Sequence, residues 1–285
     1  MLPQPPAAPP QEQIDADVAR ALAEDIGSGD VTAALLPDTA DSAYLLCKQD
    51  AVIAGRPWFD ATHRALDPQV SIDWRVREGE NVTAGTVLAT LQGRSRALVS
   101  AERTSLNFLQ TLSATATTTA RYVAAVAGTG TRILDTRKTL PGLRLAQKYA
   151  VRTGGGLNHR IGLHDAVLIK ENHIAAAGGV RAVLHAAQAV AQQASFIEIE
   201  VETLEQLNEA LDAGAQMVLL DNMPLAMLHE AVRLNAGRAV LEISGGVQLA
   251  GLRALAETGV DRISIGALTK DVRATDYSMR LQELA

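Results

Sequence analysis

The chain has 285 residues, of which 47% are hydrophobic and 20% are charged, the composition of a globular protein that can bury one large core or two moderate ones. Its single cysteine, Cys47, excludes an internal disulfide and a cysteine-rich metal site, and indicates a packing residue in a reducing cytosol. No stretch of about 18 apolar residues occurs, so the sequence predicts a cytoplasmic protein without a membrane span.

Charge is distributed unevenly along the chain. The net charge is −6 at pH 7, yet residues 132–173 carry eight Lys or Arg against three acids. Such segregation favours a site for a multiply charged small anion. The cations stand singly at predicted strand ends and Gly-rich turns and form no basic block. We therefore expect no nucleic-acid partner.

The N-terminal region has mixed character. Residues 1–13 are rich in Pro, Ala and Gln, which predicts a disordered tail and not a signal peptide. A short helix is expected over residues 14–24, and alternating apolar residues predict strands at 43–47 and 70–74. Residues 14–93 thus form an α+β region.

Residues 78–91 resemble half of a biotinyl or lipoyl carrier module, with glycines at both expected turns. A carrier needs a lysine at the tip of the hairpin, but no lysine lies between Lys48 and Lys138. We interpret the segment as an ordinary β-hairpin.

A helix is predicted over residues 101–126. Leu106, Leu109 and Leu112 have helical spacing, and glycines at 128 and 130 end the pattern. Arg103 falls in the first turn of this predicted helix.

From residue 131 onward the chain becomes regular. Short β-branched runs alternate with segments of helical period, which predicts βα units, a parallel sheet and right-handed crossovers. Too few strands are present for a typical closed eight-stranded barrel, so we expect an incomplete, open α/β barrel. A doubly wound sheet is the alternative, but no Gly-x-Gly-x-x-Gly follows the first strand. The expected strands are 132–135, 166–169, 196–201, 217–220, 240–243 and 262–265, and the expected helices are 180–193, 204–213, 225–235 and 248–258.

The residues just after these strands are the candidates for chemistry, because parallel α/β folds place their sites at the carboxyl ends of strands. Three strong cations together would suit an anion with two or more carboxylates, since Arg can bind a carboxylate through two parallel hydrogen bonds. In chain order, the strand ends carry Arg137, Lys138, Lys170, Glu200, Asp221, Ser244-Gly245-Gly246 and Gly266.

The two acids have a different predicted role. Glu200 and Asp221 follow neighbouring strands and are candidates to hold Mg²⁺ or the ribose hydroxyls of a sugar phosphate, because hard divalent cations take oxygen ligands. Glu198 and Glu202 share the strand face with Glu200 by the period of two, so spacing alone leaves the choice among the three open.

Ser244, Gly245 and Gly246 precede a predicted helix, and Gly266 follows the next strand. Backbone N–H groups in such turns can bind a phosphate, although a purely structural turn has the same sequence.

Three histidines stand in the basic region. His159, His164 and His173 match no metal-binding spacing and have no cysteine partner. We interpret His159, which precedes Arg160 and follows three glycines, as a hydrogen-bond donor that lines an anion pocket.

Several long motifs carry a resemblance to a known family. They are Asp135–Thr139 with Pro141–Arg144, Lys148–Val151, Gly154–Arg160 and Leu168–His173. With them the chain resembles the quinolinate phosphoribosyltransferases, also called nicotinate-nucleotide pyrophosphorylases. The likeness runs from Glu24–Thr32 to Ser264–Thr269. Leu140 stands where many members carry a second Thr.

The resemblance implies two domains and a homodimer. The N-terminal α/β sandwich would span residues 14–115, rejoined by a C-terminal helix within 271–285, and the open barrel would span 116–270. Arg103 would reach into the site of the partner subunit, and assembly beyond the dimer stays open.

The resemblance also implies the substrates. Arg137, His159, Arg160 and Lys170 would match the residues that bind quinolinate, with Lys138 near the reacting centre. Glu200 and Asp221 would match the acids that meet the ribose and Mg²⁺ of phosphoribosyl pyrophosphate. Its 5-phosphate would lie on the turns at Ser244, Gly245, Gly246 and Gly266.

Two other functions are open from the residues. A related transferase with another aromatic or anionic acceptor would keep the phosphoribosyl side and change the cations. A phosphosugar-binding regulatory subunit would tolerate loss of Lys138, Glu200 or Asp221. The full set of cations and acids favours the quinolinate enzyme over both.

Overall fold

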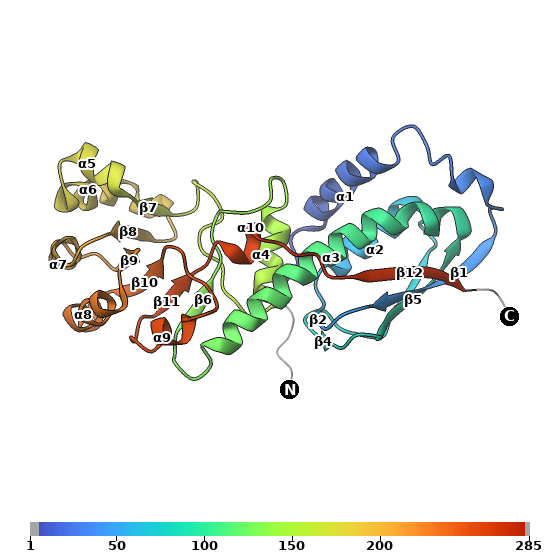
Figure 1. Ribbon diagram of the computed structural model, residues 1–285. Helices are drawn as coiled ribbons and strands as arrows, with labels where there is room; N and C mark the ends of the chain where they lie inside the picture. The colour runs from blue at the N-terminus through green and yellow to red at the C-terminus, as the bar shows by residue number, and fades with distance from the viewer. Residues whose placement is uncertain (1–5, 283–285) are drawn as a thin grey trace. The chain divides into compact units, whose positions relative to one another are not determined.

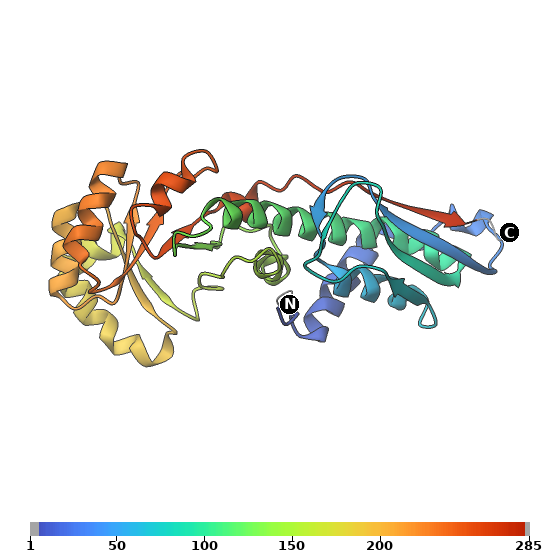
Figure 2. The ribbon, with the colours of Figure 1, turned by 90° about the horizontal axis from the view of Figure 1, so that it is seen from below.

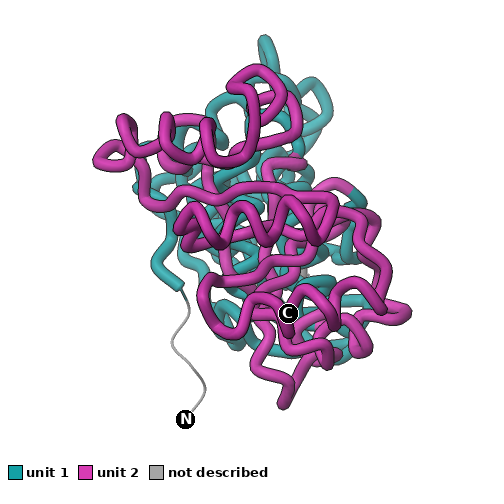
Figure 3. Tube along the Cα trace, turned by 90° about the vertical axis from the view of Figure 1, so that its left-hand side faces the viewer, with its two compact units in different colours: residues 1–120, 140–155, 271–285 teal, residues 121–139, 156–270 magenta. Residues whose placement is uncertain are grey.

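The computed structural model describes residues 6–282 and divides into two compact units (Figures 1 and 3). Unit 1 comprises residues 1–120, 140–155 and 271–285, and unit 2 comprises residues 121–139 and 156–270. The predicted boundary at 115/116 lies inside a single long helix, α3 (Ser95–Ala125). Residues 140–155, which the sequence assigned to the barrel, belong to unit 1.

Unit 1 is built on an antiparallel sheet of order β12-β1-β5-β3. Buried side chains of the sheet pack against Phe59 of α2 and the leucines of α3, among them Leu106 and Leu109. A second cluster joins α1 through Ile14 with α4 through Tyr149. The elements of this unit are α1 (Gln11–Asp25), a 3₁₀ turn (Ala33–Leu35), β1 (Ala40–Cys47), β2 (Ala51–Val52), α2 (Arg56–Leu66), β3 (Ser71–Trp74), β4 (Asn81–Val82), β5 (Val87–Arg94), most of α3, α4 (Arg144–Thr153) and β12 (Tyr277–Gln282).

Buried polar contacts tie these elements together. Glu78 accepts hydrogen bonds from the backbone N–H groups of Gly55 and Arg56 and from the Tyr149 hydroxyl, at 2.6, 3.2 and 3.0 Å. Burial raises the pKa of this carboxyl. Glu78 thereby links the start of α2 to α4 within unit 1.

Four predictions in unit 1 need correction. The disordered tail expected over 1–13 is too long, since α1 begins at Gln11; residues 1–5 lie outside the described part of the chain. Residues 78–91 form no hairpin, because β4 pairs with β2 and β5 pairs with β1 and β3. The helix predicted from 101 starts at Ser95, which puts Arg103 beyond its first turn. The C-terminal segment rejoins the unit as strand β12, paired with β1, and not as a helix.

Unit 2 contains, within the described residues, a six-stranded parallel sheet of order β6-β11-β10-β9-β8-β7. Helices of this unit line the outer side of the curved sheet (Figure 2). Its elements are β6 (Arg132–Leu134), β7 (Val167–Ile169), α5 (Glu171–Ala177), α6 (Val180–Ala187), a 3₁₀ helix (Gln188–Gln193), β8 (Ile197–Val201), α7 (Leu204–Asp212), β9 (Met217–Asp221), α8 (Leu225–Asn235), β10 (Val240–Ser244), α9 (Leu252–Ala256), β11 (Arg262–Ser264) and α10 (Ala267–Lys270).

The strand order decides between the two predicted architectures. From β7 to β11 each strand lies beside the next strand along the chain, and β6 then pairs with β11. A doubly wound sheet would reverse direction at a switch point, and this sheet does not. Because β6 and β7 are not paired, the barrel is open, as predicted. Leu157 bridges to Leu134 in parallel fashion along the free side of β6.

None of the described helices is, by itself, long and apolar enough to cross a membrane. The helical segments 171–177 and 180–193, which are bent relative to each other, reach the length and hydrophobicity of a membrane span only when they are counted together.

Candidate active site

A cavity of about 260 Å³ lies at the carboxyl ends of the strands of unit 2. Parallel strands deliver their carboxyl ends to one edge, so the residues that follow them meet there. The cavity brings together seven residues that the sequence proposed as site residues: Arg137, Lys138, His159, Arg160, Lys170, Glu200 and Ser244. Arg103 lies outside this group, exposed on α3.

Two hydrogen bonds, one to the backbone N–H and one to the backbone carbonyl, hold Lys138 in place. Its N–H donates to Thr136 Oγ1 at 3.0 Å, and its carbonyl accepts from Thr269 Oγ1 at 2.8 Å. These contacts fix the turn after β6, so the side chain of Lys138 reaches the cavity from a rigid base.

Arg160 and Arg137 bring like charges close together in the same cavity. Burial, followed by the charge of Arg137, lowers the pKa of Arg160. The Arg160 guanidinium donates to the Ala166 carbonyl at 3.4 Å. A site that holds two guanidiniums against their mutual repulsion is suited to bind a ligand with more than one negative charge.

Lys170 and Glu200 form an ion pair of 2.6 Å between Nζ and Oε2. Lys170 follows β7, and Glu200 lies near the end of the adjacent strand β8. The structure also separates the three glutamates that spacing could not distinguish: Glu200 lines the cavity, Glu198 is completely buried, and Glu202 is exposed beyond the strand.

Asp221 ends β9 and pairs in register with Ser244 at the end of β10. Its Oδ2 accepts a hydrogen bond from Asn222 Nδ2 at 2.7 Å. The Asn222 backbone N–H donates to the Ser244 carbonyl at 3.1 Å, so the two strand ends are joined next to the cavity.

A Cβ atom would clash with Asn222 at Gly245 and would displace the Lys138 side chain at Gly266. Gly245 has a φ of +98°, and a Cβ there would lie 2.1 Å from Asn222 Oδ1. At Gly266 a Cβ would lie 2.9 Å from Lys138 Cδ. Gly246, with a φ of +57°, faces open space, so its glycine is required by the backbone alone.

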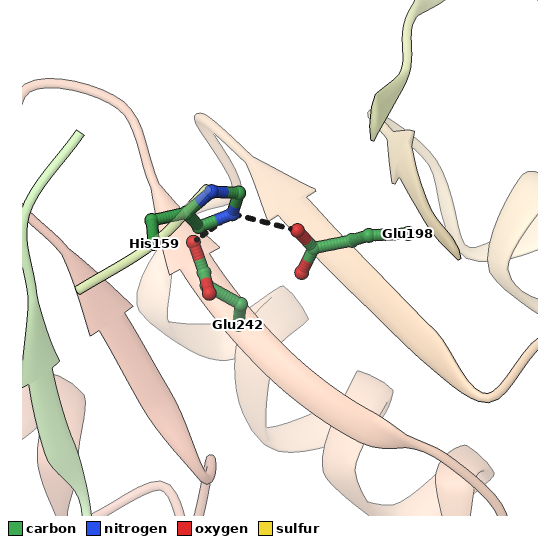
Figure 4. A group of neighbouring side chains, drawn as sticks. All are labelled: His159, Glu198 and Glu242. Carbon is green, nitrogen blue, oxygen red and sulfur yellow. Dashed lines mark hydrogen bonds and ion pairs between the residues drawn. The ribbon is translucent and has the colours of Figure 1, made fainter. Parts of the chain in front are cut away.

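His159 lies on a segment that β6 positions. Asp135, just after β6, accepts the His159 backbone N–H at 2.9 Å and the Asn158 side-chain amide at 2.6 Å. The imidazole Nε2 lies 2.8 Å from Glu198 Oε2 (Figure 4). Nδ1 accepts the Arg160 backbone N–H at 2.8 Å. Both ring nitrogens are therefore engaged within the protein, whereas the sequence predicted a donor to a ligand.

Two buried acids lie in this region: Glu242, which was not predicted as a site residue, and Glu198, which spacing left as an alternative to Glu200. Glu198 and Glu242 lie within the barrel, and burial raises the pKa of each to about 7. The sequence held a signal for Glu242, which is the single charged residue in the strand Val240–Ser244 and stands between Leu241 and Ile243. Charged residues in buried strands are rare unless they are paired or functional.

Comparison with known proteins supports a specific family. The model of the quinolinate phosphoribosyl transferase C-terminal domain matches residues 115–280, and that of the N-terminal domain matches residues 30–113. This chain belongs to the quinolinate phosphoribosyltransferase family.

The relatives are similar over nearly their whole length. A nicotinate-nucleotide pyrophosphorylase [carboxylating] from Mycobacterium leprae is 42% identical over 275 residues, 93% of this chain and 95% of the relative. A probable enzyme of the same name from Bacillus subtilis is 40% identical, over 90% of this chain and 89% of the relative. The solved nicotinate-nucleotide pyrophosphorylase from Francisella tularensis is 41% identical, with a TM-score of 0.94 and coverage of 98% and 100%.

Proposed function

We propose that this chain transfers the phosphoribosyl group of phosphoribosyl pyrophosphate to quinolinate, with loss of CO₂, to give nicotinate mononucleotide and pyrophosphate. The observation that carries the proposal is the cavity of unit 2, where four cationic side chains surround a space that also holds Glu200. Such a charge arrangement, in a chain of this family, suits a dicarboxylate acceptor beside a phosphorylated sugar. The four cations are Arg137, Lys138, Arg160 and Lys170.

In the first step the pyridine nitrogen of quinolinate attacks C1 of the ribose, and the bond from C1 to pyrophosphate breaks. The ribose passes through a cationic transition state like that of glycoside cleavage. We assign its stabilisation to the carboxylates of Glu200 and Asp221, and stabilisation of the departing pyrophosphate to Lys138. The turns at Ser244–Gly246 and Gly266 offer backbone N–H groups to the 5-phosphate.

Glu200 and Asp221 also have suitable chemistry for Mg²⁺, because hard cations take carboxylate oxygens and keep several waters. In the structure one oxygen of each acid already has a partner, Lys170 for Glu200 and Asn222 for Asp221. This donor set fits an ion that is held in large part by water and substrate. Bound Mg²⁺ would neutralise charge on the pyrophosphate.

In the second step the new pyridinium withdraws electrons from the ring. The bond to the 2-carboxylate breaks, CO₂ leaves, and a proton replaces it on the ring carbon. Arg137, Arg160 and Lys170 would hold the 3-carboxylate and keep the ring in place. The 2-carboxylate must lose stabilisation as it departs, so uniform binding of both groups would not accelerate this step.

We further propose a cytoplasmic homodimer with shared active sites. Arg103 is an exposed cation on α3 and is not part of the cavity of unit 2. An exposed position leaves its guanidinium accessible to the site of a second copy. Equilibrium sedimentation of the wild-type protein tests the dimer, and activity restored by mixing inactive Arg103→Ala and Lys138→Ala proteins tests the shared site.

The reaction is tested by mass spectrometry of products after the purified protein is mixed with Mg²⁺, phosphoribosyl pyrophosphate and either quinolinate or nicotinate. We expect nicotinate mononucleotide from quinolinate only. Product from nicotinate alone, or from neither acceptor, would refute the proposal and favour a transferase with another acceptor or a binding protein.

A further inference from the structure

His159, Glu198 and Glu242 form a buried cluster, and His159 and Glu242 also line the cavity (Figure 4). Glu198 comes from β8 and Glu242 from β10, and both are completely buried. The ring of His159 enters between them from the segment beside β6, and it packs edge-on against Phe196 with centroids 5.4 Å apart. Glu198 is thus close to the site without facing the cavity itself.

The hydrogen bonds of His159 determine where its proton lies. Nδ1 accepts the Arg160 backbone N–H at 2.8 Å, so Nδ1 carries a lone pair and no proton. The proton of the neutral ring is then on Nε2, which lies 2.8 Å from Glu198 Oε2 and 3.5 Å from Glu242 Oε1. Only the contact to Glu198 has the length of a hydrogen bond, so Glu198 is the acceptor.

The same three side chains could also be considered as ligands of a metal ion. A metal at Nε2 would need the lone pair of that nitrogen and would move the ring proton to Nδ1. Nδ1–H would then face the Arg160 N–H, donor against donor, at 2.8 Å. The geometry therefore favours a proton, and not a metal, between His159 and Glu198.

We propose that Glu198 is a positioning residue for anion binding: by accepting the His159 Nε2–H, it fixes the ring tautomer whose Nδ1 holds the Arg160 backbone and directs that guanidinium into the cavity. The role in quinolinate binding rests on the proposed function, whereas the His159 tautomer and its contact with Glu198 do not. Asp135 fixes the backbone of this segment at His159 N, and Glu198 fixes the ring. Together they hold His159, whose Nδ1 in turn holds the Arg160 backbone N–H, as a preorganised site requires.

The first test is the ¹⁵N chemical shifts of the His159 ring in the wild-type protein without substrate. We expect an unprotonated Nδ1 and a protonated Nε2. A protonated Nδ1, or a stoichiometric metal ion other than Mg²⁺ in the purified protein by elemental analysis, overturns the proposal whether or not the enzyme reaction is found.

The second test compares Glu198→Ala, Glu198→Gln and Glu202→Ala. Loss of the acceptor should raise the KM for quinolinate about 10- to 100-fold in Glu198→Ala, the effect of one lost hydrogen bond that orients a charged group. The KM for phosphoribosyl pyrophosphate should change less than about threefold. Glu198→Gln keeps an acceptor oxygen and should restore both the tautomer and most of the quinolinate affinity.

Glu202→Ala is the matched control, since Glu202 is a glutamate that lies just beyond the same strand and is exposed, and its kinetics should equal those of the wild type. If Glu198→Ala does not fold, the positioning role is tested by the kinetics of Glu198→Gln and by the ¹⁵N spectrum of the wild-type protein. An unchanged quinolinate KM in a folded Glu198→Ala protein, or equal increases in both KM values, would overturn the positioning role. Absence of any product from the wild type would instead refute the proposed function.

Discussion

Gly266 lies so close to Lys138 that a Cβ atom at position 266 would meet Lys138 Cδ at 2.9 Å. The backbone at the end of β11 thus leaves room for the side chain that we place next to the reacting centre.

Gly266→Ala should therefore reduce activity without unfolding the protein. The atom displaced is part of a flexible side chain, so Lys138 can move aside at little cost in stability. We expect kcat/KM to fall about 10-fold or more through misplacement of Lys138, with Tm changed by less than about 2 °C. Steady-state kinetics and thermal unfolding measure the two effects. Normal kinetics would show that Lys138 needs no defined position.

Gly154→Ala should lower the thermal stability of the protein, which Gly266→Ala should leave nearly unchanged. A Cβ at position 154 would lie 2.3 Å from the backbone oxygen of Ala116 and 2.8 Å from Thr119 Cβ, both on α3. Helices cannot move aside as a lysine can, and overpacking of this kind costs about 1–3 kcal/mol or more. We expect Tm to fall by roughly 5 °C. Gly266→Ala is the matched glycine substitution, and an equal Tm for both variants would contradict this prediction.

Arg137→Ala and Lys138→Ala should each lower turnover at least ~10²-fold, the usual cost of removing a charge partner of a transition state. Lys48→Ala is a suitable control, because Lys48 is an exposed cation of unit 1 that pairs with Asp276 at 3.2 Å. Circular dichroism should show the same fold for all three variants. Near-normal turnover of either site variant would refute its assigned role.

His63 should make the protein less stable in mild acid. It is buried on α2 against Phe59, and burial lowers its pKa to about 4 from 6.5. As pH falls below 6.5, the unfolded chain binds a proton that the folded protein does not bind until about pH 4. The stabilising effect of the neutral ring is thus complete above pH 6.5 and is lost toward pH 4.

Between pH 7 and pH 5 this group should cost the wild type about 2 kcal/mol of unfolding free energy. Denaturant titrations at the two pH values measure it. His63→Gln, which has no titrating ring, should lose about that much less over the same range. His185→Gln, at an exposed position on α6, should behave as the wild type does. Equal pH dependence of wild type and His63→Gln would contradict the assignment.

The sequence determined the strands of the open barrel and the residues that gather at their carboxyl ends. Period and β-branched runs located all six strands of the parallel sheet, because each buried strand repeats the same local demand for apolar residues. Residues that follow such strands reach one edge by chain geometry alone, so Arg137, Lys170 and Glu200 could be assigned to one cavity before the structure was known.

In unit 1, local sequence patterns could not predict which strands pair with each other. Residues 78–91 have the turn glycines of a hairpin, yet β4 and β5 pair with different strands. The C-terminal strand β12 finds its partner in β1, more than 200 positions earlier in the chain. Such contacts depend on the burial of one sheet face against α2 and α3, which no short window of sequence contains.

The roles of Glu198 and His159 were decided only by tertiary structure. Glu198 and Glu200 are equivalent by period, but one is sealed inside the barrel and the other faces the cavity. His159 follows no strand, and its position depends on Asp135 and Glu198, which lie 24 and 39 residues away in sequence. A sequence specifies which side chains can donate or accept a proton, whereas the donor and acceptor that meet are fixed only when distant elements pack together.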